Sequence, residues 1–248
     1  MEELEHSLFI VRFFNKLFGK PLSYLLGLVG IEIQNPEKLF PDHVVMVIIV
    51  VFFLILFFGL CVRRLRLVPS KLQSALELII EIFEGLLIDT IGERGKKYLP
   101  LIATIGIFIL VCNLLGLVPG FMSPTSKLNV TAGCALVVFF YYHWQGIKSQ
   151  GLLKYLKQFT GPIPFLAPLL LPIEIISHFS RPVSLSLRLF GNIFAEELLI
   201  VIIASILPFF LPLPFMAVAI FTSVIQAFVF VLLACIYISG AIAHEEEH

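Results

Sequence analysis

Long runs of apolar residues dominate the chain, and polar residues gather between them. Runs close to the ~18–20 residues that cross the hydrocarbon core of a bilayer occupy 44–62 and 98–118, and a shorter run occupies 129–146. Two further runs, 163–207 and 213–243, are too long for one upright crossing, because ~45 helical residues extend ~65 Å. The pattern predicts an all-α integral membrane protein with about five membrane helices, the last two long and steeply tilted.

Prolines interrupt the first of these two long runs. Pro162, Pro164, Pro168 and Pro172 lie in its first part, and Pro182 lies further along. Proline removes a helical hydrogen bond and clashes with the preceding turn. We therefore expect an irregular first part, followed by a kink or a new helix at Pro182.

Two segments outside the apolar runs have a mixed pattern. We expect residues 1–41 to form an external or interfacial segment, followed by a single membrane domain over residues 42–248. Pro69-Ser70 is typical of a helix start, and acidic residues then recur at helical spacing opposite apolar ones, at Glu77, Glu81 and Glu84. This spacing predicts an amphipathic helix over about 70–92 on the cytoplasmic surface. Its polar face is either simply solvated or a docking surface for a partner subunit.

Composition and charge agree with a membrane protein and predict its orientation. The chain is 59% hydrophobic and 14% charged, whereas about 25% of residues are charged in soluble domains. Basic residues concentrate in the loops after the first and third runs, which predicts that both loops are cytoplasmic. Five crossings then place the N-terminus outside and the C-terminus in the cytoplasm. The acidic start, Met1-Glu-Glu-Leu-Glu5, predicts no cleaved export signal, and an untargeted chain of this length indicates a bacterial inner membrane.

Arg188 lies within an apolar run, where an arginine costs about 2.5–3.5 kcal/mol on insertion scales and marks a functional site by default. At ~100° per residue, six other polar side chains fall within about a third of the helix circumference around it. They are Glu174, His178, Arg181, Ser184, Asn192 and Glu196. Glu197 falls on the opposite face. Glu174 lies ~21 Å before Arg188 and Glu197 ~13 Å after it along the axis.

This layout suits an ion path in two halves. Ionisable groups would relay an ion from each membrane surface, and the fixed charge would block direct passage. The alternative is that Arg188 pairs with Glu196 or Glu197 and only holds helices together. Gln226, in the last run, is by itself more typical of a hydrogen bond between helices.

The segment Arg181-Pro-Val-Ser-Leu-Ser-Leu-Arg188-Leu-Phe-Gly-Asn192-Ile-Phe-Ala-Glu-Glu197 closely resembles the signature helix of subunit a of F-type ATP synthases, the stator half of their proton channel. Four further segments resemble family counterparts in the family's order: Pro69 to Glu77, Asn113 to Pro119, Pro172 to Glu174 and Gln226 to Phe230. The resemblance covers nearly the whole chain from Asp42 onward.

The resemblance implies a non-catalytic membrane subunit that presses two slanted helices against a rotating ring of c subunits. It also implies a b-subunit peripheral stalk and a soluble ATPase head as partners, with neither cofactor, metal nor nucleic acid. Arg188 matches the family's essential arginine. Glu197, Asn192 and Gln226 match residues of the outer half-channel, and Glu174 and Ser184 match positions near the cytoplasmic half. The coupling ion implied is H⁺, although the ring's own site decides between H⁺ and Na⁺.

The chain departs from some family members at three positions. Ala219 stands where those members have a histidine in the outer channel, and Glu196 stands where they have glycine. Gly116 replaces an aspartate found in some relatives. We expect Glu196 to supply the proton-handling group that Ala219 lacks, since the two helices should be adjacent.

Two other functions fit parts of the sequence. The last five residues, His244-Glu-Glu-Glu-His248, satisfy the H-E-x-x-H pattern of zinc proteases, but a chain end frays and no third ligand is evident. A solvated acidic tail is the plain alternative. A self-contained transporter or channel often shows internal repeats, and none is visible here.

Overall fold

The computed structural model describes residues 9–19, 40–63, 69–118, 121–158, 167–207 and 210–242, and all regular structure in them is helical. The helices are α1 (Phe9–Phe14), the π-helix η2 (Asn15–Gly19), α3 (Asp42–Val62), α4 (Lys71–Ile91), the 3-10 helix η4 (Glu93–Tyr98), α5 (Leu99–Leu115), the 3-10 helix η5 (Pro124–Ser126), α6 (Leu128–Gln150), α7 (Leu152–Gln158), α8 (Ala167–Ile206) and α9 (Pro212–Ile242). The predicted all-α class is confirmed.

Four helices of the described part are long and apolar enough to cross a membrane. They are α3, α5 together with η4, α8 and α9. The fifth predicted span corresponds to α6, which has 23 residues but is too polar to meet the same criterion, since its second half carries His143, Gln145, Lys148 and Gln150. Four of the five predicted spans are thus supported by length and composition, and the crossing by α6 stays a prediction.

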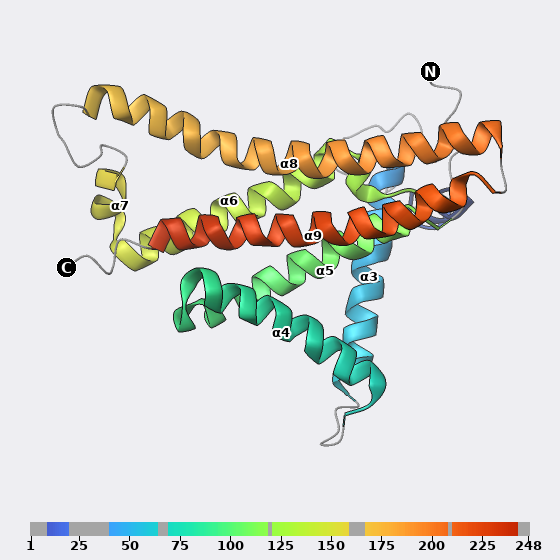
Figure 1. Cartoon of the computed structure of the whole chain (residues 1–248), viewed down its shortest axis with the longest axis horizontal. Coiled ribbons are helices and arrows are strands. Elements are labelled where there is room, and N and C mark those ends of the chain that lie inside the picture. The colour runs from blue at the N-terminus through green and yellow to red at the C-terminus, as the bar shows by residue number, and fades with distance from the viewer. Residues whose placement is uncertain are drawn as a thin grey trace.

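Helix α9 is the centre of the fold and packs against α4, α5, α6 and α8. Figure 1 shows α8 and α9 side by side along the longest axis of the molecule, with α3 crossing their direction. The core between these helices includes the fully buried side chains of Tyr142, Leu189, Phe230 and Ile238. At Gly106 of α5, an added Cβ would meet Phe83 of α4 and Val231 of α9 at 2.8 Å each. A larger residue at this position would require the Phe83 and Val231 side chains to shift.

Helix α4 matches the predicted amphipathic helix within a residue at each end. The Ser70 hydroxyl accepts a hydrogen bond from the Gln73 backbone N–H (3.4 Å), and Gly92, with φ of 84°, ends the helix. Leu87 is buried, and Glu77 and Glu81 are exposed, as the pattern predicts. Whether this helix lies on the cytoplasmic surface stays a prediction.

Helix α8 is one continuous helix of 40 residues that contains both Pro172 and Pro182. The expectation of an irregular first part is therefore wrong for residues 167–172, and Pro182 starts no new helix. Pro168 lies in the first turn, where its missing N–H costs no helical bond. The other two prolines each remove a single bond in a long helix that packs against α6 and α9. The remaining prolines of this run, 162 and 164, lie outside the described residues.

The described part of the N-terminal segment is attached to the membrane domain. The Asn15 side chain exchanges two hydrogen bonds with the backbone of Phe40, at 3.1 and 3.0 Å. Val11 is buried together with Val45 and Met46 of α3. Leu115 of α5 and Phe121 pack against the same cluster, so these contacts join α1 and η2 to α3 and to the end of α5.

Candidate functional site

Arg188 lies on an exposed face of α8. A neighbouring side of the helix is buried through Leu185, Leu189 and Ile193, each 3% exposed or less. Arg188 forms neither a hydrogen bond nor an ion pair with any other residue that the structure describes. The alternative in which Arg188 pairs with Glu196 or Glu197 is therefore not the arrangement seen here.

One turn beyond Arg188, α8 is linked to α9 through two amides. The Asn192 side-chain Nδ2 donates to Oε1 of Gln226 at 2.6 Å. Gln226 is buried, at 5% exposure, whereas Asn192 is exposed on the side of Arg188. Gln226 thus forms the helix-to-helix hydrogen bond expected from its own position, and its partner belongs to the predicted polar stripe.

Glu196 and Glu197 point to different neighbours, as their helical positions predict. Glu196 interacts with the Thr222 hydroxyl of α9. Glu197 interacts with the Ser126 hydroxyl and the Ser123 backbone, at the two ends of η5. Ala219 is fully buried and lies one turn before Thr222. Helix α8 packs against α9, so the expected adjacency of the two helices is confirmed.

The surroundings of Glu197 contain a buried chain of hydrogen bonds that the sequence reading missed. The Ser123 hydroxyl donates to the Cys112 carbonyl (3.0 Å) and lies 2.7 Å from the Thr125 hydroxyl. Thr125 donates to Oδ1 of Asn113 (2.6 Å), and Asn113 donates to the Ser223 carbonyl of α9 (3.4 Å). The only sequence feature that pointed to this hydrogen-bonded chain was the run Ser123-Pro-Thr-Ser126, which cannot be told from an ordinary turn by sequence alone.

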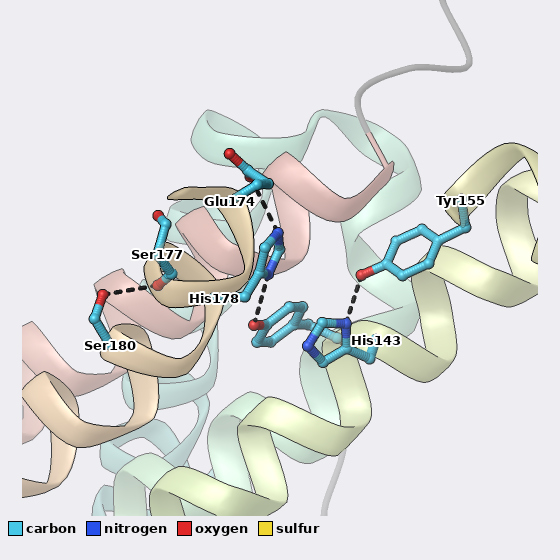
Figure 2. Close-up of polar contacts among 7 residues, drawn as sticks. His143, Tyr155, Glu174, Ser177, His178 and Ser180 are labelled. Carbon is cyan, nitrogen blue, oxygen red and sulfur yellow. Dashed lines mark hydrogen bonds and ion pairs between the residues drawn. The ribbon is translucent and has the colours of Figure 1, made fainter. Parts of the chain in front are cut away.

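A second polar cluster surrounds the other end of the stripe (Figure 2). Nε2 of His178 lies 3.2 Å from Oε1 of Glu174, and its Nδ1 lies 3.3 Å from the Tyr142 hydroxyl of α6. Nδ1 of His143 lies 2.6 Å from the Tyr155 hydroxyl of α7. The sequence predicted Glu174 and His178 but missed the contribution of α6 and α7.

Arg181 belongs to the same cluster. Its guanidinium carbon lies 5.4 Å from the ring centroid of Tyr237 of α9, and its side chain also interacts with Tyr142. A cation over an aromatic ring is stabilised by the ring's quadrupole. Unlike Arg188, this arginine therefore has partners within the chain.

The two clusters lie at opposite ends of one helix, with Arg188 between them. Glu174 and Glu197 are separated by ~35 Å of helix axis. Ser184 is exposed one turn before Arg188. The hydrogen bonds found among the described residues do not connect the two clusters past Arg188.

The described residues contain no group of three or more His, Cys, Asp or Glu side chains placed to hold a metal ion. The clusters above instead consist of hydroxyl, amide, imidazole and carboxyl groups, of which the imidazoles and carboxyls can take up and release protons. The pair His244 and His248 of the H-E-x-x-H pattern lies outside the described residues.

Comparison with known proteins gives consistent matches over most of the chain. The family model described as ATP synthase A chain matches residues 44–239. ATP synthase subunit a 1 of Pelobacter propionicus is 43% identical over 243 residues, which cover 98% of this chain and 99% of that protein. ATP synthase subunit a of Trichlorobacter lovleyi is 52% identical over 186 residues, 75% of this chain and 80% of that protein. ATP synthase subunit a of Geobacter sulfurreducens is 43% identical over 98% of this chain and 99% of its own length.

Proposed function

Since the chain belongs to the ATP synthase A chain family, whose members are proton-translocating stator subunits without catalytic ATP chemistry, we propose that Arg188 separates two proton half-channels that open to opposite sides of the membrane. The observation that carries this proposal is an exposed arginine, with no partner in the described chain, between two clusters that contain proton-handling groups. Among the described residues, no chain of hydrogen bonds connects the two clusters past it.

Arg188 acts on a carboxylate of the rotor. A cation at bilayer depth is costly without a counter-charge, and the described chain supplies none, so a carboxyl group carried past by a c-subunit ring is the natural partner. The arginine attracts the ionised carboxylate, favours release of its proton and repels any proton that would pass directly between the halves. Arginine suits this position better than lysine because it stays charged and offers a planar fork to a carboxylate.

The outer half-channel is formed by the groups near the end of α8. Glu197, with the hydroxyls around Ser123, is its outermost proton-handling group. Glu196 and Asn192 of α8, together with Gln226 of α9, continue the path toward Arg188. Glu196 takes the proton-handling position for which Ala219 offers no side chain. The second half-channel lies at the start of α8 and includes Glu174, His178 and Ser184.

The exposed face of α8 that carries Ser184, Arg188 and Asn192 is the surface proposed to meet the ring.

A b-subunit peripheral stalk holds the stator, and a soluble ATPase head completes the complex. We place the subunit in a bacterial inner membrane, with its N-terminus outside and its C-terminus in the cytoplasm. One proton moved through 100 mV provides about 2.3 kcal/mol, so several protons must pass for each ATP made.

The proposal is tested by ATP-driven acidification of inverted membrane vesicles carrying Arg188→Ala. We expect assembly of the complex, checked by co-purification with the ring and the head, and loss of acidification to background. Leu187→Ala is the matched control, because this neighbouring side chain is 49% exposed and uncharged, and it should acidify normally. Normal acidification by an assembled Arg188→Ala complex would show that the arginine is structural.

A further inference from the structure

A cluster of two imidazoles, two phenols and a carboxyl group joins three helices at the start of α8 (Figure 2). Glu174 and His178 belong to α8, Tyr142 and His143 to α6, and Tyr155 to α7. Within it, Glu174 is partly exposed, on the side of α8 that also carries Arg188, whereas Tyr142 and Tyr155 are 1% and 4% exposed. The cluster thus reaches from a buried contact with α7 to a carboxyl group on the proposed ring-facing side.

His178 has a polar partner at each ring nitrogen. Its Nδ1 faces the Tyr142 hydroxyl at 3.3 Å and its Nε2 faces the Glu174 carboxylate at 3.2 Å. A neutral imidazole accepts at one nitrogen and donates at the other. Such a ring can take up a proton on one side and release its other proton to the carboxylate, which is the geometry of a relay.

His143 provides a second imidazole on the side of α7. Its Nδ1 lies 2.6 Å from the Tyr155 hydroxyl, and its ring centroid lies 5.3 Å from that of His178. The two imidazole rings are therefore neighbours in the cluster. The Tyr155 ring is fixed against α6, because a Cβ at Gly146 would lie 2.5 Å from its Cε2. Burial raises the pKa of Tyr155 to about 12, so the hydroxyl stays protonated at neutral pH.

Charged groups around the imidazoles restrict how many protons they hold. Arg181 lies beside Tyr142 and over the Tyr237 ring of α9, and Glu174 is the acidic group in contact with His178. Two imidazolium rings beside each other and beside an arginine would repel strongly. The pair therefore holds one extra proton at a time, which suits step-by-step delivery to Glu174.

We propose that Tyr155, His143 and His178 form a proton-collecting relay that takes protons from the side of α7 and delivers them to Glu174 for transfer to the rotor. In each step a group gains one proton from the outer side and releases one to the next group. The Tyr142 hydroxyl, which faces Nδ1 of His178, gives its proton to that nitrogen as it takes one from the side of His143, so the charge of the relay is restored. During ATP synthesis, protons pass along the relay in the opposite direction, from the rotor to the side of α7. This inference rests on the proposed function, and it assigns α6 and α7 a role in the second half-channel.

The test measures the initial rate of ATP-driven acidification in inverted vesicles as a function of the pH of the medium, which contacts the α7 side. His143→Asn keeps a polar atom near the position of Nδ1 but cannot carry a proton. A collecting group matters most when protons are scarce, so we expect near-normal rates at about pH 5.5 and a deficit that grows to about tenfold at about pH 8. Tyr155→Phe, which keeps the ring on Gly146, should show a smaller deficit of the same form.

His43→Asn is the matched control, because this histidine lies at the start of α3, and it should follow the wild-type profile. A deficit that is equal at every pH, or an unchanged rate in both variants, would overturn the relay and leave these side chains a packing role. Rates are compared per assembled complex, and Tyr155→Phe decides the outcome if His143→Asn fails to assemble. Failure of the proposed function is distinguishable, since it would appear as normal pumping by Arg188→Ala.

Discussion

At the scale of single residues, Arg188 differs from every other charged side chain of α8. Glu174, Arg181, Glu196 and Glu197 each contact a partner inside the chain, whereas Arg188 has none among the described residues. A membrane charge without a partner costs several kcal/mol unless it meets a counter-charge or water. This cost is understandable if the counter-charge belongs to another subunit and arrives transiently.

The two adjacent glutamates should differ in importance. Glu197→Gln removes the proton-handling group at the outer polar network, and we expect ATP-driven acidification to fall by about tenfold or more. Glu196→Gln keeps a hydrogen-bonding partner for Thr222 and should reduce the rate less, by about two- to fivefold, since Glu197 still supplies protons. Both rates come from the inverted-vesicle assay. An unchanged rate for Glu196→Gln would exclude it as a substitute for the group missing at Ala219.

At the scale of elements, the long helix α8 places the whole polar stripe on one rigid rod. The period of the apolar residues predicted which side chains share a face, and the contacts of Asn192, Glu196 and Glu197 agree with it. The same reasoning overestimated the effect of Pro172 and Pro182, because packing against α6 and α9 stabilises a helix beyond its local propensities.

The close approach of three helices at Gly106 offers a test of packing. Gly106→Ala places a methyl group 2.8 Å from Phe83 and from Val231, and we expect a loss of about 1–3 kcal/mol in stability, seen as a lower thermal transition of the purified complex. Gly59→Ala on α3 is the control, since a Cβ there meets nothing within 4 Å. This substitution should be neutral or slightly stabilising, because alanine favours a helix over glycine. Equal transitions for both variants would contradict the packing described.

At the scale of the whole molecule, two polar clusters lie toward opposite ends of α8. Most of the residues that α8 contacts in these clusters come from distant parts of the chain. Asn113 meets Ser223 across 110 residues, and Tyr142 meets His178 across 36. A helical period predicts which residues share a face of one helix, but it carries no information about which loop or helix covers that face. Ser123, Thr125, His143 and Tyr155 were therefore missed, whereas the residues on α8 itself were predicted.

The separation of the two clusters by Arg188 is tested most directly by passive proton conduction with the rotor at rest. Inverted vesicles without nucleotide, in which the bound head does not turn the ring, receive an imposed pH gradient, and its decay is followed in wild-type, Leu187→Ala and Arg188→Ala membranes. We expect slow decay in the first two and a fast leak in Arg188→Ala, because protons then pass between the half-channels without rotation. An assembled Arg188→Ala complex that stays as tight as the wild type and still pumps on addition of ATP would contradict this separation.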